Sequence, residues 1–283
     1  MSGLKALRNR LRSVKSTQKI TKAMRMVAAS KLNKSKNFAA LADSYKQKII
    51  SLLSSAQEVS SDELLKTIPS AIFSEKTEFS NTILIVFGSD RGLCGAYNSN
   101  IFKKVKEDLS KYRNPKIIAI GKKIATILSK ITKIESTIPS AEGHDIISKK
   151  VLDIIENETT KEPATQVLVY FTKFKNALVQ MPASNRLIPL DLSSIPKDQN
   201  RLNTEFDGKN LLDTLSKIYI KSNIIASLLE SKASQEAASM TAMDGATRNA
   251  GEMIKRLTLQ LNRTRQAVIT NELIEVIAGS KAT

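Results

Sequence analysis

The segment GSDRGLCGAYN (residues 88–98) has the composition of a loop that could hold a phosphate. It follows directly on the apolar, strand-like run TILIVF (82–87), and α/β proteins often bind phosphates at such strand-to-helix turns. Its glycines, however, match neither G-x-G-x-x-G nor G-x-x-x-x-G-K-[ST]. The glycines concerned are Gly88, Gly92 and Gly95.

The end of the second strand-like run also argues against a nucleotide. That run finishes in Gly121-Lys122-Lys123, where a dinucleotide fold places an acidic residue on the ribose hydroxyls. The sequence therefore favours a tight turn that needs unusual backbone angles. With one histidine, His144, and one cysteine, Cys94, we predict no catalytic residue, metal site or cofactor.

The charge balance points to an acidic partner. The 283 residues carry a formal net charge of +17, which suits nucleic acid, an anionic membrane surface or an acidic protein. No apolar run approaches the roughly 20 residues that span a bilayer, so we expect no direct membrane insertion. The single cysteine suits a reducing compartment, and the basic N-terminus lacks the apolar region of a secretory signal.

Proline placement predicts two long terminal helices. All seven prolines lie between Pro69 and Pro196, and proline costs a helix interior about 3 kcal/mol. Apolar residues recur at helical spacing in both proline-free ends. In the first end these are Leu4, Leu7, Leu11, Val14, Ile20, Met24, Val27, Phe38, Leu41, Tyr45, Ile49 and Leu52. In the last they are Leu211, Leu215, Ile218, Ile225, Leu229, Met240, Ile254, Leu257, Leu261 and Val268.

A helix from near 211 to near 278 would be on the order of 100 Å long. Such a helix needs a partner of similar length, and we expect an intramolecular coiled coil with the first helix. Between them, residues 82–88, 116–121 and 166–172, with a weaker fourth run at 186–190, read as strands that alternate with helices. The predicted class is α/β, a long coiled coil with an inserted Rossmann-like, parallel domain. Residues 135–145 read as a surface loop.

The predicted domains are residues 1–68 (first helix), 69–205 (α/β domain) and 206–283 (last helix). Two segments then resemble a known family. LKALRNRLRSVKSTQKITKAMRMVAASKL (4–32) and ATRNAGEMIKRLTLQLNRTRQAVITNELIEVIAGS (246–280) are similar to the terminal helices of the gamma subunits of F-type ATP synthases. The loop at 88–98 resembles that family's loop after the first strand of the central domain.

The resemblance implies a non-catalytic rotor shaft. In that family the two terminal helices form a long antiparallel coiled coil that turns inside a ring of three α and three β subunits. The α/β domain forms a foot with the epsilon subunit on the membrane c-ring. It further implies a peripheral location on the cytoplasmic face of a bacterial inner membrane, or alternatively on the matrix face of the mitochondrial one. The competing hypothesis is a basic coiled-coil protein that binds nucleic acid. Against it, aromatic side chains are not interleaved with the basic residues.

The resemblance also assigns site residues. Those expected to contact the β subunit are Arg265, Gln266, Thr270, Glu272, Met24 and Arg25. The foot loop comprises Gly88, Asp90, Arg91, Gly92, Cys94 and Gly95, with Asp90 and Arg91 offering polar contacts and Cys94 a convenient labelling site.

Overall fold

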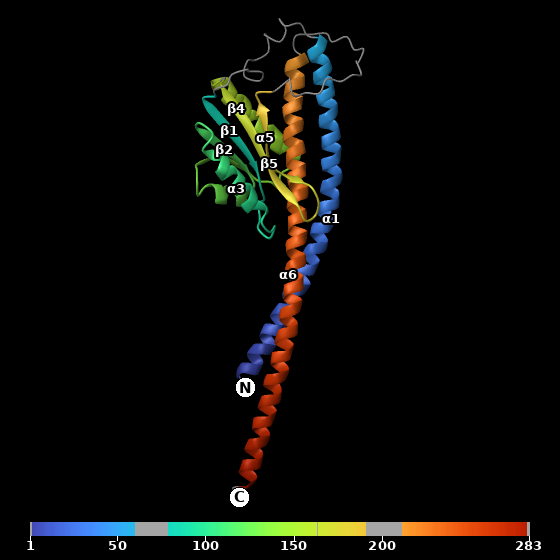
Figure 1. The fold of residues 1–283 in the computed structure, drawn as a ribbon, viewed down its shortest axis with the longest axis vertical. Coiled ribbons are helices and arrows are strands. Elements are labelled where there is room, and N and C mark those ends of the chain that lie inside the picture. Colours follow the sequence, from blue (N-terminus) through green and yellow to red (C-terminus); the bar gives the residue numbers. More distant parts are fainter. Residues whose placement is uncertain (1, 60–78, 163, 191–210, 282–283) are drawn as a thin grey trace. The chain divides into compact units, whose positions relative to one another are not determined.

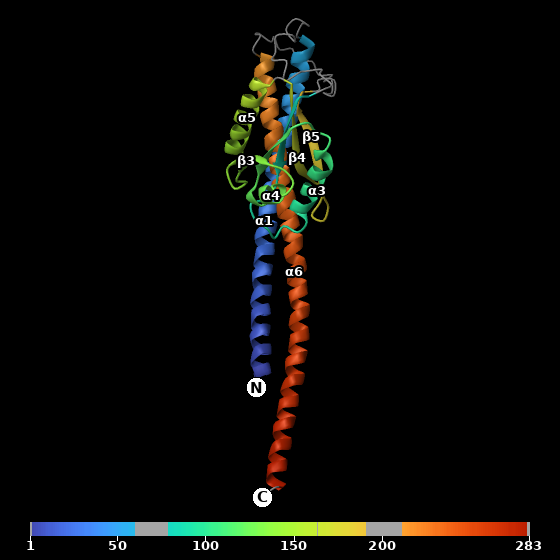
Figure 2. The ribbon, with the colours of Figure 1, turned by 90° about the vertical axis from the view of Figure 1, so that its left-hand side faces the viewer.

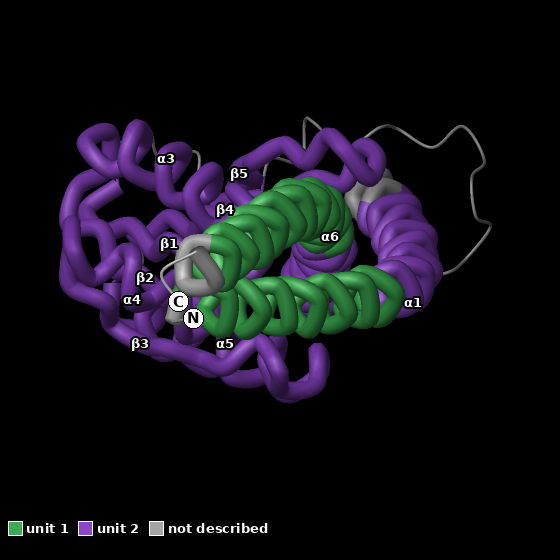
Figure 3. The backbone as a smooth tube through the Cα atoms, turned by 90° about the horizontal axis from the view of Figure 1, so that it is seen from below, with its two compact units in different colours: residues 1–28, 240–283 green, residues 29–239 purple. Residues whose placement is uncertain are grey.

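The computed structural model describes residues 2–59, 79–162, 164–190 and 211–281. These form two compact units, one of residues 1–28 with 240–283 and one of residues 29–239, which Figure 3 colours separately. The predicted domain boundaries at 68/69 and 205/206 lie outside the described residues.

Two long helices account for both ends of the chain. Helix α1 spans Ser2–Val59 and helix α6 spans Leu211–Lys281, so they contain 58 and 71 residues (Figure 1). The prediction of long terminal helices around an α/β domain is thereby confirmed. Among the described residues, no helix combines the length and the apolar character that crossing a bilayer needs.

The larger unit contains a five-stranded sheet with the strand order β3-β2-β1-β4-β5. Strands β1 to β4 are parallel, and within the sheet Leu84 of β1 lies between Ile117 of β2 and Leu168 of β4. The elements in chain order are β1 (Asn81–Phe87), α3 (Tyr97–Leu109), β2 (Pro115–Ile120), α4 (Lys122–Leu128), β3 (Ile134–Ile138), α5 (His144–Lys161), β4 (Thr165–Phe174) and β5 (Gln180–Ile188).

The fourth predicted strand is present but antiparallel, which corrects the expectation of a parallel sheet. Strand β5 pairs with β4 through a short turn in which the Asn176 side chain accepts hydrogen bonds from the N–H groups of Leu178 and Val179. A connection this short permits only an antiparallel return, because a parallel one needs a crossover of a dozen or more residues.

Strand β3 (Ile134–Ile138) overlaps the start of the segment 135–145 that the sequence favours as a loop, so that prediction is wrong for residues 135–138. The strand is five residues long, and exposed Glu135 and Thr137 alternate with the more buried positions. As an edge strand it needs only one apolar face. Because the strand contains few apolar residues, a search for apolar runs does not find it.

Each face of the sheet packs on its own helices. One face buries α3 and α4 through Ile101, Val105 and Ile124. The other buries α5 and also the parts of α1 and α6 that belong to this unit, through Leu53, Val151 and Ile224. Figure 2 shows α3 and α5 on opposite sides of the sheet.

Within this unit, α6 is enclosed on nearly all sides. Small residues on α6 let the helix lie close to the end of strand β4. Two serines of α6 form hydrogen bonds there with backbone groups of Thr172. Ser231 Oγ accepts from the Thr172 N–H at 3.0 Å, and Ser234 Oγ donates to the Thr172 carbonyl at 2.8 Å. Glu230 accepts a third bond from the N–H of Phe174 at 3.2 Å. The sheet is thus built directly onto the last helix.

Removing the Ile224 side chain should test this packing. Ile224 is 0% exposed between the sheet and the helices, so Ile224→Ala is expected to lower the free energy of unfolding by about 2–5 kcal/mol in urea denaturation. The control Leu178→Ala, at a hairpin tip where the side chain is 79% exposed, should change it by less than about 0.5 kcal/mol. Equal effects would contradict the proposed core.

Candidate functional site

In the smaller unit, the two helical segments run antiparallel and meet through polar side chains. Arg25 Nη1 lies 2.7 Å from Asp244 Oδ1, and the Thr247 hydroxyl donates to the Thr21 hydroxyl at 2.9 Å. The Gln18 amide donates to the Thr247 carbonyl at 3.4 Å. Residue numbers fall along one helix as they rise along the other, which fixes the antiparallel direction.

The buried face of α1 differs from the predicted apolar stripe in the middle of the helix. Side chains turned inward recur at alternating steps of three and four, as in a coiled coil. They are Leu4, Leu7, Leu11, Val14, Gln18, Thr21, Arg25, Ala28, Leu32, Ser35, Ala39, Ala42, Lys46, Ile49 and Leu53. Several residues assigned to the stripe are instead exposed, namely Ile20, Met24, Val27, Phe38, Leu41 and Tyr45.

The correction has a simple geometric cause. The helix keeps the phase set by Leu11 and Val14, and that phase reaches Gln18 rather than Ile20. Following the nearest apolar residue therefore moves the predicted stripe to another face. Continuing the spacing of Leu11 and Val14 along the helix would have identified Gln18 and Thr21 as polar members of the seam. A search for apolar residues does not find them.

The two predicted contact residues on α1 have different surroundings. Met24 is 38% exposed on the outer face. Arg25 faces α6, and its side chain retains 43% exposure while it pairs with Asp244. Asp244 also forms an ion pair with Arg248, whose Nε lies 3.4 Å from Oδ2, so the carboxylate bridges two cations. Arg25 therefore already has an intramolecular partner.

The C-terminal end of α6 is an exposed helix of unusual composition. From Ile269 to Ile277 every side chain is exposed. Five of them are large and apolar, and such a concentration is typical of an interaction site. They are Ile269, Leu273, Ile274, Val276 and Ile277.

All four predicted contact residues on α6 lie at or beside this exposed end. Arg265, Gln266, Thr270 and Glu272 are exposed, and none forms a side-chain hydrogen bond or ion pair with any described residue. Their polar groups are therefore available to another chain. Nothing within the described part of the chain competes for them.

In the larger unit, the glycine loop is organised by the carboxylate of Asp90. Oδ1 accepts the N–H groups of Lys122 at 2.9 Å and Ser140 at 3.1 Å. Oδ2 accepts the Ser140 hydroxyl and the Ala141 N–H, both at 2.9 Å. Four hydrogen bonds thus tie the loop after β1 to the start of α4 and to the segment after β3.

Burial alone would raise the pKa of Asp90, but the hydrogen bonds from Lys122, Ser140 and Ala141 outweigh it. The pKa of this carboxyl therefore lies below its ordinary value. The charged form is the one that the fold stabilises. An internal carboxylate accepts backbone N–H groups at the edge of the sheet where related α/β folds bind a phosphate.

Close packing explains the glycines on this edge. A Cβ at Gly88 would lie 2.3 Å from Ile124 Cβ, and one at Gly121 would lie 2.8 Å from the Ser89 carbonyl oxygen. Gly95 has a φ of 54°, so it occupies the left-handed region that favours glycine. A Cβ at Gly92 would meet nothing within 4 Å. The turn predicted from the sequence thus depends on packing at one end and backbone angle at the other.

The remaining loop residues divide into exposed and buried. Arg91 is exposed, whereas the Cys94 sulfur is buried and lies 3.4 Å from the Asn98 amide nitrogen. The prediction that Cys94 is a convenient labelling site is therefore wrong. Among the described residues, no group of three or more His, Cys, Asp or Glu side chains is placed to hold a metal ion.

Comparison with known proteins decides the family. The pattern of the ATP synthase family matches residues 3–283. The ATP synthase gamma chain of Rickettsia canadensis is 40% identical over 291 residues, with both chains covered in full. That of Rickettsia felis is 40% identical over 303 residues, again with full coverage. The chain belongs to the ATP synthase gamma-chain family.

Solved structures show the same fold. A chain of the Euglena gracilis mitochondrial ATP synthase, in a structure of OSCP, F1 and c-ring, superimposes with a TM-score of 0.71 and 17% identity. The match covers 99% of this chain and 94% of that one. A chain in the Tetrahymena thermophila central stalk and c-ring gives a TM-score of 0.59 at 23% identity, covering 80% and 99%.

Replacing Asp90 should expose the importance of its charge. Asp90→Asn turns an amide NH₂ toward N–H donors, so it is expected to cost about 1–3 kcal/mol at neutral pH. A lowered pKa stabilises the fold above the ordinary aspartate value of 3.8, and this is lost as pH falls through the lowered pKa. In urea titrations the difference from wild type should therefore narrow below pH 3.8. The control Asp153→Asn, at an exposed position on α5, should change the free energy of unfolding by less than about 0.5 kcal/mol.

The seam of the helix pair has its own test. Leu257 is 6% exposed, so Leu257→Asp with Leu261→Asp places two carboxylates against α1 and should reduce the helical circular dichroism signal. The matched control is Leu259→Asp, on the same helix, where the side chain is 61% exposed. If the double variant retained the wild-type spectrum and melting temperature, the pairing would be refuted.

Proposed function

We propose that this chain is the central rotor shaft of an ATP synthase, which transmits torque between a membrane c-ring and three catalytic β subunits. The chain is itself non-catalytic in this proposal. Its gamma-chain relatives support the role, and so do structures of similar fold, which belong to the rotor and the central stalk of mitochondrial ATP synthases. In this role the surface of the chain makes sliding contacts with other subunits and catalyses no reaction.

The single observation that carries the proposal is the exposed C-terminal end of α6. Five large apolar side chains in nine residues would be costly to leave in water, and a surrounding ring of α and β subunits would cover them. Glu272 lies among them and Arg265 one turn before them, and neither has a side-chain partner in the described part of the chain. They can therefore exchange contacts with successive β subunits as the shaft turns.

Coupling requires contact energies that differ with angle. A shaft drives a β subunit between conformations only if its contacts favour one conformation at that angle. The net charge of +17 adds a long-range attraction for acidic loops on surrounding subunits. Such attraction retains the shaft without fixing one orientation.

The larger unit is proposed as the foot that meets the epsilon subunit and the c-ring. Exposed Arg91 beside the rigid Asp90 turn supports a docking role for the loop, while the Asp90 carboxylate itself is used internally. The proposed location is the cytoplasmic face of a bacterial inner membrane, bound peripherally, which agrees with the bacterial relatives. The matches to known proteins give no support to the nucleic-acid alternative.

Replacing Arg265 and Gln266 together by Ala tests the contact role. Losing one charge-assisted hydrogen bond, worth about 1.5 kcal/mol, corresponds to about a tenfold effect, so proton pumping driven by ATP hydrolysis should fall by about that factor. The measurement uses the variant assembled with α, β and the other subunits in vesicles. Circular dichroism of the variant should remain unchanged, because both side chains are exposed.

The control replaces Lys103 and Glu107, an exposed pair on α3 that the resemblance does not assign to the β subunit. This variant should pump at the wild-type rate. Normal pumping by the Arg265 and Gln266 variant would remove these residues from the coupling surface. Failure of the wild-type chain to assemble an active ATPase would overturn the rotor proposal itself.

A further inference from the structure

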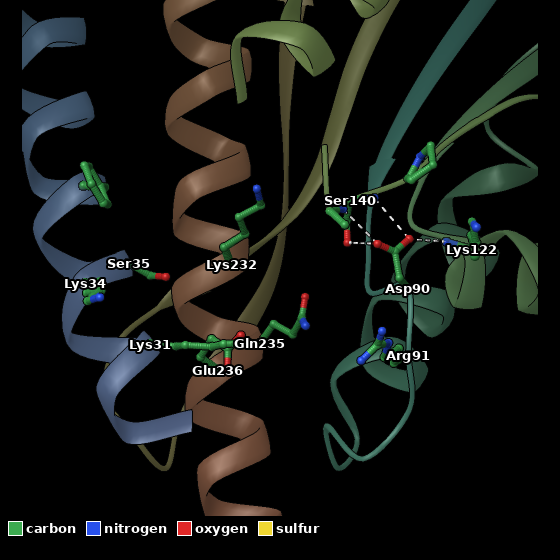
Figure 4. A pocket seen from close by; sticks show the side chains of 13 residues that line it. Lys31, Lys34, Ser35, Asp90, Arg91, Lys122, Ser140, Lys232, Gln235 and Glu236 are labelled. Atoms are coloured by element: carbon green, nitrogen blue, oxygen red, sulfur yellow. Dashed lines mark hydrogen bonds between the residues drawn. The ribbon is translucent and has the colours of Figure 1, made fainter. Parts of the chain in front are cut away.

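A cavity of about 650 Å³ lies within the larger unit, between the two long helices and the glycine loop. Figure 4 shows Lys232 and Gln235 extending from α6 toward the loop that carries Asp90 and Arg91. Its volume falls in the range of sites that hold small molecules. The cavity adjoins the loop but is separate from the exposed helix end on which the rotor proposal rests.

The wall of the cavity has an excess of positive charge. Five cationic side chains face two carboxylates, so three positive charges are uncompensated. The cationic residues are Lys31, Lys34, Arg91, Lys122 and Lys232. None of the five forms a side-chain hydrogen bond or a close ion pair with any described residue, whereas Lys104 and Lys111 both pair with Asp108.

The two carboxylates leave most of this charge free. Asp90 already accepts four hydrogen bonds from its own domain, at the back of the cavity. Burial raises the pKa of Glu236, and the charge of Lys31, which Figure 4 shows extending toward it from α1, opposes that shift. Lys34, Arg91 and Lys122 therefore remain without a counter-charge of their own.

Lys232 is the most unusual of these cations. It lies half-buried on α6, and this burial lowers its pKa despite the opposing influence of Asp90. A buried ammonium without a close partner is costly, and an added anion would relieve that cost. The lysine is therefore poised for a ligand with negative charge.

The other lining residues suit a compact anion with several charges. Ser35 and Gln235 add uncharged donors, and Phe38, Pro139 and Ala141 form an apolar part of the wall. One carboxylate could neutralise only one of several spread cations, whereas linked phosphates present several charges over a few ångströms. The apolar part of the wall offers a flat contact for a base.

We propose that this cavity binds a condensed phosphate group, carried either by inorganic pyrophosphate or by a nucleoside triphosphate. The phosphates lie between α6 and the loop and contact Lys232 and Arg91 there. Lys34 and Phe38 line the α1 side of the cavity, where the Phe38 ring accepts the base if one is present. The site differs from a glycine-loop nucleotide site, because the loop amides at this edge are already occupied by Asp90.

Calorimetric titration of the purified full chain with pyrophosphate tests the proposal directly. Saturable binding is expected with one site per chain at physiological ionic strength. Lys232→Met keeps the length of the side chain and removes its charge, so affinity should fall by at least about tenfold. The matched control, Lys103→Met, removes an exposed charge from α3 outside the cavity and should change affinity by less than about twofold.

A second arm with ATP in the same magnesium-free buffer separates the two sources of phosphate. Tighter binding of ATP that Phe38→Ala selectively removes assigns the site to a nucleoside triphosphate. Equal or weaker binding of ATP assigns it to pyrophosphate. If Lys232→Met fails to fold, as its melting curve would show, Arg91→Met takes its place.

Two results would overturn the proposal. One is the absence of saturable heat with either probe at millimolar concentration. The other is an equal loss of affinity in Lys232→Met and Lys103→Met, which indicates attraction to the general charge of the protein. Neither result bears on torque transmission, which rests on the end of α6.

Discussion

The pairing of α1 with α6 is the constraint on which the rest of the structure depends. Most of the stability of helices in proteins comes from the packing of one face, and for much of their length α1 and α6 provide that face for each other. The seam positions of α1 recur in steps of three and four from Leu4 to Leu53. In the larger unit the same helices also provide a surface for the sheet, so the α/β domain depends on them for part of its core.

A second dependence links the sheet to its loops. In a related nucleotide-binding fold, the carboxyl edge of the parallel strands would meet a phosphate supplied by the ligand. Here the Asp90 carboxylate, which is part of the chain, accepts hydrogen bonds from the backbone N–H groups of Lys122, Ser140 and Ala141 at that edge. The loop is therefore rigid without a cofactor. This rigidity suits a domain that transmits force. Because the Asp90 carboxylate is used by backbone groups, it is also not a close partner of the neighbouring lysines.

Much of the fold was predictable because proline placement and apolar runs are local signals. The long helices, three parallel strands and α3 to α5 follow from them. Strand β3 was missed because an edge strand needs few apolar residues, and the direction of β5 depends on the length of its turn. The middle of the α1 seam was misplaced because Gln18 and Thr21 carry no apolar signal.

The candidate site was accessible to sequence reasoning only where the family resemblance supplied it. Arg265 and Gln266 would otherwise read as an ordinary solvated face, since exposure is the only property that the helix itself gives them. The cavity lysines could not have been grouped from the sequence. Lys31, Lys122 and Lys232 lie about a hundred residues apart and meet only through tertiary packing.

The polar seam also limits how the two helices can slip past one another. Shifting α1 by one heptad would move Arg25 from Asp244 to a position opposite Gly251 or Ala237, so Arg25 would lose its partner and Asp244 would keep only Arg248. The contact between Thr21 and Thr247 would be lost in the same movement. Small alanine-rich seams pack almost equally well at many offsets. The ion pair therefore gives one alignment of the two helices a lower free energy than the neighbouring offsets. Torque can then pass along the two helices without being lost to axial slippage.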